Sequence, residues 1–433
     1  MRSVYFLRMA IAVFALVLTN NLSAQMVGAD VFLKGRYVEV GIGHLGYYGS
    51  DASAPSGYHS HPAGKLGFVS DPGMDGWAVG SPAMMGDYFL PGTPFEGWDI
   101  EINGQRCQGY NTGSSGSSLI TSAGTGTGAN VSYAAVGSKV SGTWQGMFDS
   151  VAITQITTLD TNDLYFTVKV ILTNTAVAPK NNIYYLRSLD PDNDQSWLGG
   201  SFSTHNVIEN QSTDTTIVSA TGISSSAPFL GLGTADTAAT ALIYNSWPIT
   251  ISSSLAAAYT GALSGSFVGP VGTDHFGDIA IGIVMNIPHL ATVDSAGDSV
   301  YRTTAVAATR HPKNSASFTY FYAFSKAAAD SAIAHTMLTY PTGTLGTITN
   351  VNNVADVKVY PNPSKDQISI TGLTSTDHVA LYDMMGRSAD QNWSVTHDGT
   401  STFRYSNVPV GSYVVVITDA GGNIKSRVAI RKN

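Results

Sequence analysis

The chain has 433 residues, of which only 12% are charged, and its formal net charge is −8 at pH 7. The charged share is about half the usual one, and an acidic balance without a basic run argues against nucleic-acid binding. Cys107 is the single cysteine, so an intrachain disulfide is excluded and stability must come from a large hydrophobic core.

The first residues have the pattern of a secretory signal peptide. Arg2 and Arg8 give the first residues a positive charge, and an apolar run follows over Met9–Leu18. We expect the signal peptide to cover residues 1–24, with cleavage after Ala24. Its apolar run is shorter than the roughly 20 residues that span a bilayer. No later segment is apolar enough, so we expect no transmembrane segment in the mature chain.

Residues 25–146 are rich in Gly, Pro, Asp and aromatic residues, and we expect few strands there, joined by long loops. Val38–Ile42 and Lys65–Val69 are the strands that the pattern predicts. Aromatic side chains on such loops could stack on sugar rings and bind glycans. The alternative is that they anchor the loops in small cores. The aromatic residues are Tyr47, Tyr48, Tyr58, Trp77, Tyr88, Phe89, Phe95, Trp98 and Tyr110.

Two further groups in this region could hold a metal ion. His59 and His61 lie on one face of an extended segment, and with His44 or a remote carboxylate they could bind Zn²⁺. Asp71 and Asp75 form an oxygen-rich turn. The alternatives are a loop with two surface histidines and a tight turn whose geometry depends on its glycines.

Residues 147–337 alternate between apolar and polar positions, as strands do. Val151–Leu159 and Leu164–Thr173 predict a hairpin, and a short helix is expected over Ala327–Met337. We therefore predict an all-β fold in which residues 25–337 form one large antiparallel β-sandwich body. The order of its segments resembles the broad sandwiches of galactose-mutarotase-like domains, a likeness that concerns the fold and not the activity.

An acidic turn follows the predicted strand Ile183–Leu189. Asp190, Asp192 and Asp194 present oxygen ligands at alternate positions, which is the chemistry that Ca²⁺ prefers. The spacing is not that of an EF-hand, because Gln195 stands where that loop needs glycine. The alternative to a calcium site is a solvated turn in which Asp and Asn cap their own backbone.

The C-terminal region predicts a second, smaller β domain over residues 354–433, after a Thr/Gly/Asn-rich linker at 338–353. Pro361 and Pro363 favour a rigid extended kink. About seven short strands in roughly 80 residues favour a small immunoglobulin-like sandwich.

Motifs in this region, in this order and spacing, resemble the type A C-terminal sorting domain of the type IX secretion system of Bacteroidetes-type bacteria. The matching residues are Tyr360, Pro361, Asn362, Pro363, Asp383, Gly386, Arg387, Gly411 and Tyr413. The resemblance implies export by the outer-membrane type IX machinery, cleavage within residues 340–355 and attachment to surface lipopolysaccharide.

A further pattern matches the O-glycosylation acceptor of Bacteroidetes-type secreted proteins, an Asp followed by Ser or Thr and then a small aliphatic residue or Thr. The candidate acceptors are Ser150, Thr215, Thr237, Ser295, Ser299 and Ser331.

We expect a secreted or cell-surface protein with a non-enzymatic role, either structural or in binding glycans or partner proteins. No serine elbow or phosphate loop is present in the sequence. The alternative is a carbohydrate-active enzyme, namely a hydrolase, a lyase or a mutarotase-like protein. A cleft with convergent carboxylates, histidine and aromatic residues would favour the enzyme.

Overall fold

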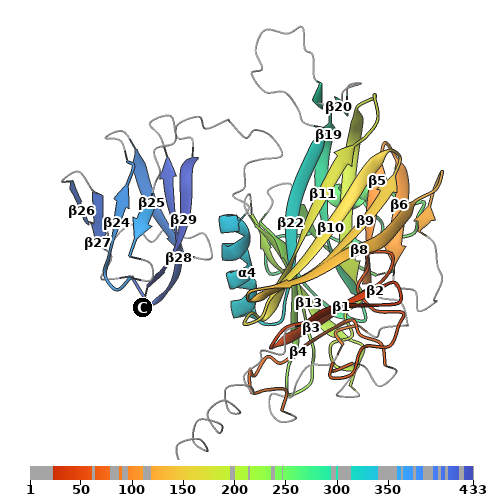
Figure 1. Cartoon of the computed structure of the whole chain (residues 1–433), viewed down its shortest axis with the longest axis horizontal. Coiled ribbons are helices and arrows are strands. Elements are labelled where there is room, and N and C mark those ends of the chain that lie inside the picture. The colour runs from red at the N-terminus through yellow and green to blue at the C-terminus, as the bar shows by residue number, and fades with distance from the viewer. Residues whose placement is uncertain are drawn as a thin grey trace, which may run out of the picture.

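The computed structural model (Figure 1) describes residues 23–339 and 358–432, with internal gaps. The gaps are 61–63, 79–86, 90–95, 111–118, 196–199, 213–214, 236–238, 246, 294–298, 301–313, 362–363, 374–376, 384–393, 398–400, 405–407 and 419–423. The described residues form antiparallel sheets with two helices, so the all-β prediction is confirmed.

A four-stranded sheet comes first in the chain. Its strands, in spatial order, are β1 (Ser23–Val27), β2 (Asp30–Lys34), β3 (Val38–Ile42) and β4 (Phe68–Ser70). β1 begins at Ser23, so the expected cleavage after Ala24 would remove its first two residues. Gln25, which pairs with Phe32, would then be the first residue of the strand. The shortened strand would keep three of its five pairs.

The largest sheet has nine strands and forms one layer of the body (Figure 1). In spatial order they are β18 (Asp274–Gly277), β13 (Thr204–Gln211), β14 (Thr216–Thr221), β15 (Phe229–Thr234), β22 (Ser315–Ala323), β11 (Tyr165–Asn174), β10 (Val151–Asp160), β9 (Lys139–Phe148) and β8 (Thr127–Val136). The predicted hairpin is β10 and β11, in which Ile153 pairs with Leu172. Its inward side chains alternate with partly exposed ones, which gives the period of two seen in the sequence.

The second layer is a seven-stranded sheet. In spatial order its strands are β17 (Ser266–Phe267), β16 (Ala239–Tyr244), β19 (Ala280–Leu290), β12 (Lys180–Leu189), β5 (Glu96–Ile102), β6 (Gln105–Tyr110) and β7 (Ile120–Thr121). The short β20 (Thr292–Val293) and β21 (Ser299–Val300) pair with each other. The helices are α3 (Leu255–Thr260), which lies against β12, and α4 (Lys326–Thr339), which lies against β22.

One hydrophobic core joins both layers and the four-stranded sheet. Trp98 of β5 lies 5.1 Å, between ring centroids, from Trp144 of β9. Tyr185 of β12 makes an edge contact with Phe318 of β22 at 5.2 Å. Side chains of the two large sheets therefore interdigitate, as in a sandwich.

A buried ion pair crosses this core. The Arg187 guanidinium donates from Nε and Nη2 to the two carboxylate oxygens of Glu96, at 2.5 and 2.8 Å. Tyr322 of β22 donates its hydroxyl to Glu96 at 2.8 Å, and the Tyr48 amide donates to the other oxygen at 2.6 Å. The network thus ties the two layers to the loop after β3.

The C-terminal region contains two further sheets. They are β23 (Lys358–Tyr360), β24 (Gln367–Thr371), β27 (Ser401–Arg404) and β26 (Ser394–His397) in one, and β25 (His378–Asp383), β28 (Gly411–Thr418) and β29 (Ile424–Lys432) in the other. Ile368, Phe403 and Val415 belong to the core that they share. The Tyr413 hydroxyl donates to the Pro409 carbonyl at 2.7 Å, a contact like the tyrosine corner of immunoglobulin-like sandwiches.

Candidate functional site

The described residues contain one group of three ionisable side chains that could hold a metal ion, namely Asp30, His44 and Asp51. Asp30 opens β2, whereas His44 and Asp51 lie in the loop between β3 and β4. That loop folds back on β3, because the Gly49 amide donates to the Gly41 carbonyl of β3 at 3.0 Å and Gly46 adopts a φ of 80°.

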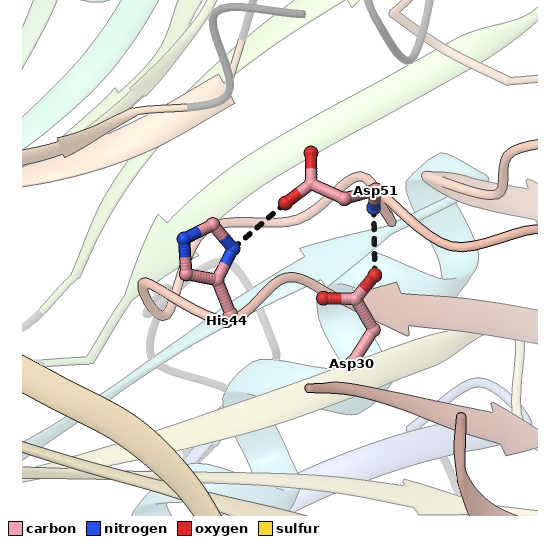
Figure 2. A group of neighbouring side chains, drawn as sticks. All are labelled: Asp30, His44 and Asp51. Atoms are coloured by element: carbon pink, nitrogen blue, oxygen red, sulfur yellow. Dashed lines mark hydrogen bonds and ion pairs between the residues drawn. The ribbon is translucent and has the colours of Figure 1, made fainter. Parts of the chain in front are cut away.

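Figure 2 shows how the three side chains converge. His44 Nδ1 lies 2.7 Å from Asp51 Oδ2, and Tyr47 donates its hydroxyl to the same oxygen at 2.8 Å. Asp30 Oδ2 accepts the backbone amides of Asp51 and Ala52, both at 2.7 Å. One ligand atom from each of Asp30, His44 and Asp51 lies within 4.8 Å of the other two.

The two carboxylates of this group differ in electrostatic environment. Burial raises the pKa of Asp30, and the neighbouring Asp51 charge adds to the rise, although two backbone amides oppose it. Burial would also raise the pKa of Asp51, but hydrogen bonds from His44 and Tyr47 outweigh it, so that pKa is lowered. Burial raises the pKa of the Tyr47 hydroxyl as well, which keeps it a hydrogen-bond donor.

This arrangement supports two kinds of chemistry. An imidazole oriented by a carboxylate, beside a tyrosine hydroxyl, can accept or donate a proton. One imidazole nitrogen with two carboxylates can also bind a divalent cation. The sequence named His44 only as a further ligand for His59 and His61, and it did not identify Asp30 or Asp51, because these residues come together only when the loop folds back.

In the acidic turn after β12, Asp194 accepts backbone hydrogen bonds, whereas Asp190 and Asp192 have raised pKa values. Asp194 Oδ2 accepts the backbone amides of Ile223 and Ser224, at 2.6 and 3.0 Å. Burial, followed by the charge of Asp278, raises the pKa of Asp190 to about 7. Burial and the charges of Asp190 and Asp278 raise the pKa of Asp192 to about 8.

Among the described residues, the carboxylates of this turn do not form a group of three with ligand atoms within 4.8 Å. Asp192 Oδ1 and Asp194 Oδ1 are nevertheless buried without a hydrogen-bond partner. Asp278, which precedes β19, was not part of the predicted calcium site, since it is far from Asp190 and Asp192 in the chain. Calcium at Asp190, Asp192 and Asp194 stays a prediction.

Two of the other predicted metal ligands, Asp71 and His59, have hydrogen-bonding or packing roles. Asp71 Oδ2 accepts the amides of Gly76 and Trp77, both at 2.9 Å, so it shapes its turn. His59 Nδ1 lies 3.0 Å from Glu39 Oε1, and its ring stacks on Trp77 at 4.1 Å. His61 lies outside the described residues.

The aromatic residues of the first region are mainly core residues. Six of the nine have exposed fractions of at most 3%, and they are Tyr47, Tyr48, Tyr88, Phe89, Trp98 and Tyr110. Tyr58 and Trp77 are partly exposed, and Phe95 lies outside the described residues. The anchoring alternative therefore accounts for most of this set.

The predicted O-glycosylation acceptors differ in accessibility. Ser150 and Ser331 are exposed, whereas Thr215 is buried. Ser299 belongs to β21. Thr237 and Ser295 lie outside the described residues.

The described residues of the sorting motif lie near strand ends. Tyr360 ends β23, and Asp383 at the end of β25 pairs with Tyr413, two residues after Gly411 opens β28. Pro361 follows β23 directly. Asn362, Pro363, Gly386 and Arg387 lie outside the described residues.

Comparison with protein families assigns the C-terminal region. A family model described as "Secretion system C-terminal sorting domain" matches residues 358–431. Residues 358–431 are a secretion system C-terminal sorting domain. The sorting domain directs the chain to the cell surface or the extracellular space, and the resemblance read from the motifs is confirmed. Within the described part of the chain, no helix combines the length and hydrophobicity of a membrane span.

Comparison of the chain with solved structures gives low sequence identities. No curated protein matches the chain in sequence. A structure described as "Polysaccharide Lyase BACCELL_00875" is 11% identical with a TM-score of 0.27, covering 96% of this chain and 47% of that one. A chondroitinase AC lyase in oligosaccharide complexes is 12% identical with a TM-score of 0.18, covering 70% and 37%. The chain spans less than half the length of either structure.

Proposed function

We propose that the body is a non-enzymatic surface scaffold, structural or binding in role, that its sorting domain delivers to the outside of the cell. The observation that supports this proposal is the use of polar and aromatic side chains inside the fold. Glu96, Arg187 and Trp98 are each fully buried, so they connect sheets instead of lining a surface. Side chains in such places support the architecture of the body and are not presented on its surface.

A second buried network supports the same proposal. Arg106 of β6 donates to Asp99 at 2.6 Å and to the Ser253 carbonyl at 2.8 Å, while Tyr110 donates its hydroxyl to Asp99. Glu101 accepts the Leu255 amide at the start of α3, at 2.6 Å. Arg106 and Glu101 therefore connect the α3 segment to the seven-stranded sheet.

The test is a paired assay of binding and turnover on the purified chain beginning at Gln25. The chain is applied to a glycan array and incubated with neutral and acidic polysaccharides, and new reducing ends and unsaturated uronates are measured. We expect no turnover, with or without glycan binding. Catalytic turnover by the wild type would overturn the proposal.

The rival function, a carbohydrate-active enzyme, has one specific observation in its favour. The partly exposed His44 and Asp51 and the buried Tyr47 form a group capable of proton transfer, with contacts of 2.7 and 2.8 Å. If turnover is found, the variants His44→Ala and Tyr47→Phe decide whether this group performs it. Loss in both would assign the active site here, whereas unchanged rates would place it elsewhere.

A further inference from the structure

We propose that Asp30, His44 and Asp51 form a binding site for a divalent transition-metal cation of the Zn²⁺ or Mn²⁺ class. The first support is convergence from separate segments. Asp30 comes from β2, and His44 and Asp51 from two points of the loop after β3, yet their ligand atoms lie within 4.8 Å of one another. A cation placed among them would be within reach of all three side chains.

The second support is an unsatisfied oxygen. Asp30 is only 2% exposed, and its Oδ1 is buried without a hydrogen-bond partner. In Figure 2 the oxygen of Asp30 that takes no bond from Asp51 lies on the side of the carboxylate that faces His44. A buried carboxylate oxygen left unpaired costs free energy, and a bound cation would satisfy it.

The third support is the set of contacts that orients the ligands. The amides of Asp51 and Ala52 hold Asp30 through its other oxygen. Tyr47 donates to Asp51 Oδ2 and so constrains that carboxylate from the side. Outer contacts of this kind normally orient metal-binding carboxylates and histidines.

The ligand types select the class of metal. Imidazole nitrogen suits zinc and other first-row transition ions, whereas Ca²⁺ prefers oxygen ligands alone. Three protein ligands leave at least one coordination position for water or an outside oxygen. The His44 and Asp51 side chains are 21% and 15% exposed, so that position would be reachable by a hydroxyl or carboxylate of an external ligand.

The chain supplies a matched control for this site. His205 Nδ1 lies 3.1 Å from Asp274 Oδ2, which is the same type of pair as His44 and Asp51. Both of its side chains are about half exposed, at 51% and 45%. No metal-binding group of three among the described residues includes this pair.

The experiment uses the purified chain beginning at Gln25, stripped with chelator and then titrated with Zn²⁺, Mn²⁺ or Ca²⁺. Calorimetry and elemental analysis measure the bound ion, and circular dichroism verifies folding. We expect one equivalent of Zn²⁺ or Mn²⁺, at least tenfold weaker binding in His44→Gln and Asp51→Asn, and unchanged binding in His205→Gln. No binding by the wild type, or binding that survives both substitutions, would overturn the proposal.

A spectroscopic measurement covers the case in which the site variants do not fold. Pulsed EPR of the Mn²⁺-loaded wild type should show nitrogen hyperfine coupling from one imidazole, and His205→Gln should keep it. A spectrum without nitrogen coupling, or one that loses it in His205→Gln, would rule out His44 as the ligand.

Discussion

At the scale of single residues, Arg187 shows how a charge is held inside the core. Its guanidinium bonds to both oxygens of Glu96 and lies 4.4 Å from the centre of the Tyr48 ring. It also donates to the Gly46 carbonyl and the Gln155 side chain, both at 3.1 Å. A buried ion pair contributes little net stability when compared with apolar residues, but removing one partner leaves the other charge uncompensated.

Replacing Arg187 by methionine should therefore lower the free energy of unfolding by about 3–5 kcal/mol. The double variant with Glu96→Gln should recover part of that loss, because the lone carboxylate charge is gone. Urea denaturation followed by tryptophan fluorescence measures both changes. The control is Lys326→Met, whose partner is Glu209 and whose side chain is 72% exposed, and it should cost less than about 1 kcal/mol. Equal effects of the buried and exposed substitutions would contradict this account.

The raised pKa values of Asp190 and Asp192 make the stability of the body depend on pH. Both folded-state values, about 7 and about 8, lie above the ordinary value of 3.8, so the folded protein binds these protons more tightly than the unfolded chain. Their contribution to stability is fully present below pH 3.8 and is lost as the pH rises through 7 to 8.

Asp192→Asn should consequently raise the melting temperature at pH 8.5 in the presence of chelator, and change it little at pH 4. Thermal melts by circular dichroism at the two pH values measure this. If the predicted calcium site is filled, added Ca²⁺ should stabilise the wild type at pH 8.5 but not the variant. The same gain at both pH values would show that Asp192 is not the titrating group.

At the scale of elements, two glycines on β8 and β9 leave room for the Trp144 ring. Gly128 and Gly146 pair across the two strands, and a Cβ on either would lie 2.1–2.2 Å from the Trp144 ring. The Trp144 indole therefore occupies space that a side chain at either position would need. Its Nε1 donates to the His44 carbonyl at 3.0 Å, which fixes the loop that carries the proposed metal site.

Gly146→Ala should lower the free energy of unfolding by about 1–3 kcal/mol, the usual cost of overpacking, because the Trp144 ring must move. Chemical denaturation measures the loss, and near-ultraviolet circular dichroism should report the displaced indole. Ala134→Ser at an exposed position of β8 is the control. An unchanged near-ultraviolet spectrum in a destabilised variant would argue against displacement of the ring.

Strands could be predicted from the sequence where apolar and polar side chains alternate. They could not be predicted where the strand carries acidic residues that are buried in the fold. β3 has the predicted bounds, Val38–Ile42. In the predicted hairpin, β10 begins at Val151 as expected and ends one residue later, and both ends of β11 lie one residue later than predicted. β5 was missed because Glu96, Asp99 and Glu101 are acidic residues, which strands normally avoid. Their partners come from other elements, so nothing local reveals that this segment is buried.

At the scale of the whole molecule, the body and the sorting domain have separate sheets and separate cores. The sorting domain has its own two sheets and its own core. The core of the body runs from Val31 to Ile333 and includes residues of the loop-rich first region. The sheets and the core of the sorting domain are therefore distinct from those of the body.

Removing residues 358–433 should keep the chain inside the cell envelope of a host that has the type IX machinery. Immunoblots of periplasmic, outer-membrane and culture fractions measure this, and the wild-type chain should reach the surface or the medium. The intact mass of the exported wild-type protein should correspond to a chain that starts at Gln25 and ends within residues 340–355. Export of the truncated chain would show that another segment carries the address.

The sequence by itself determined the all-β class and the export route, because strand alternation and sorting motifs are local patterns that can be read along the chain. The tertiary structure alone decided the place of the charged and aromatic side chains. Glu96 forms an ion pair with Arg187, which is 91 residues away in the sequence. Asp30 accepts a hydrogen bond from the Asp51 amide, which is 21 residues away. Contacts of this kind depend on sheet order and loop path, which the alternation of residues does not encode. The candidate site could therefore be recognised only after the chain was folded.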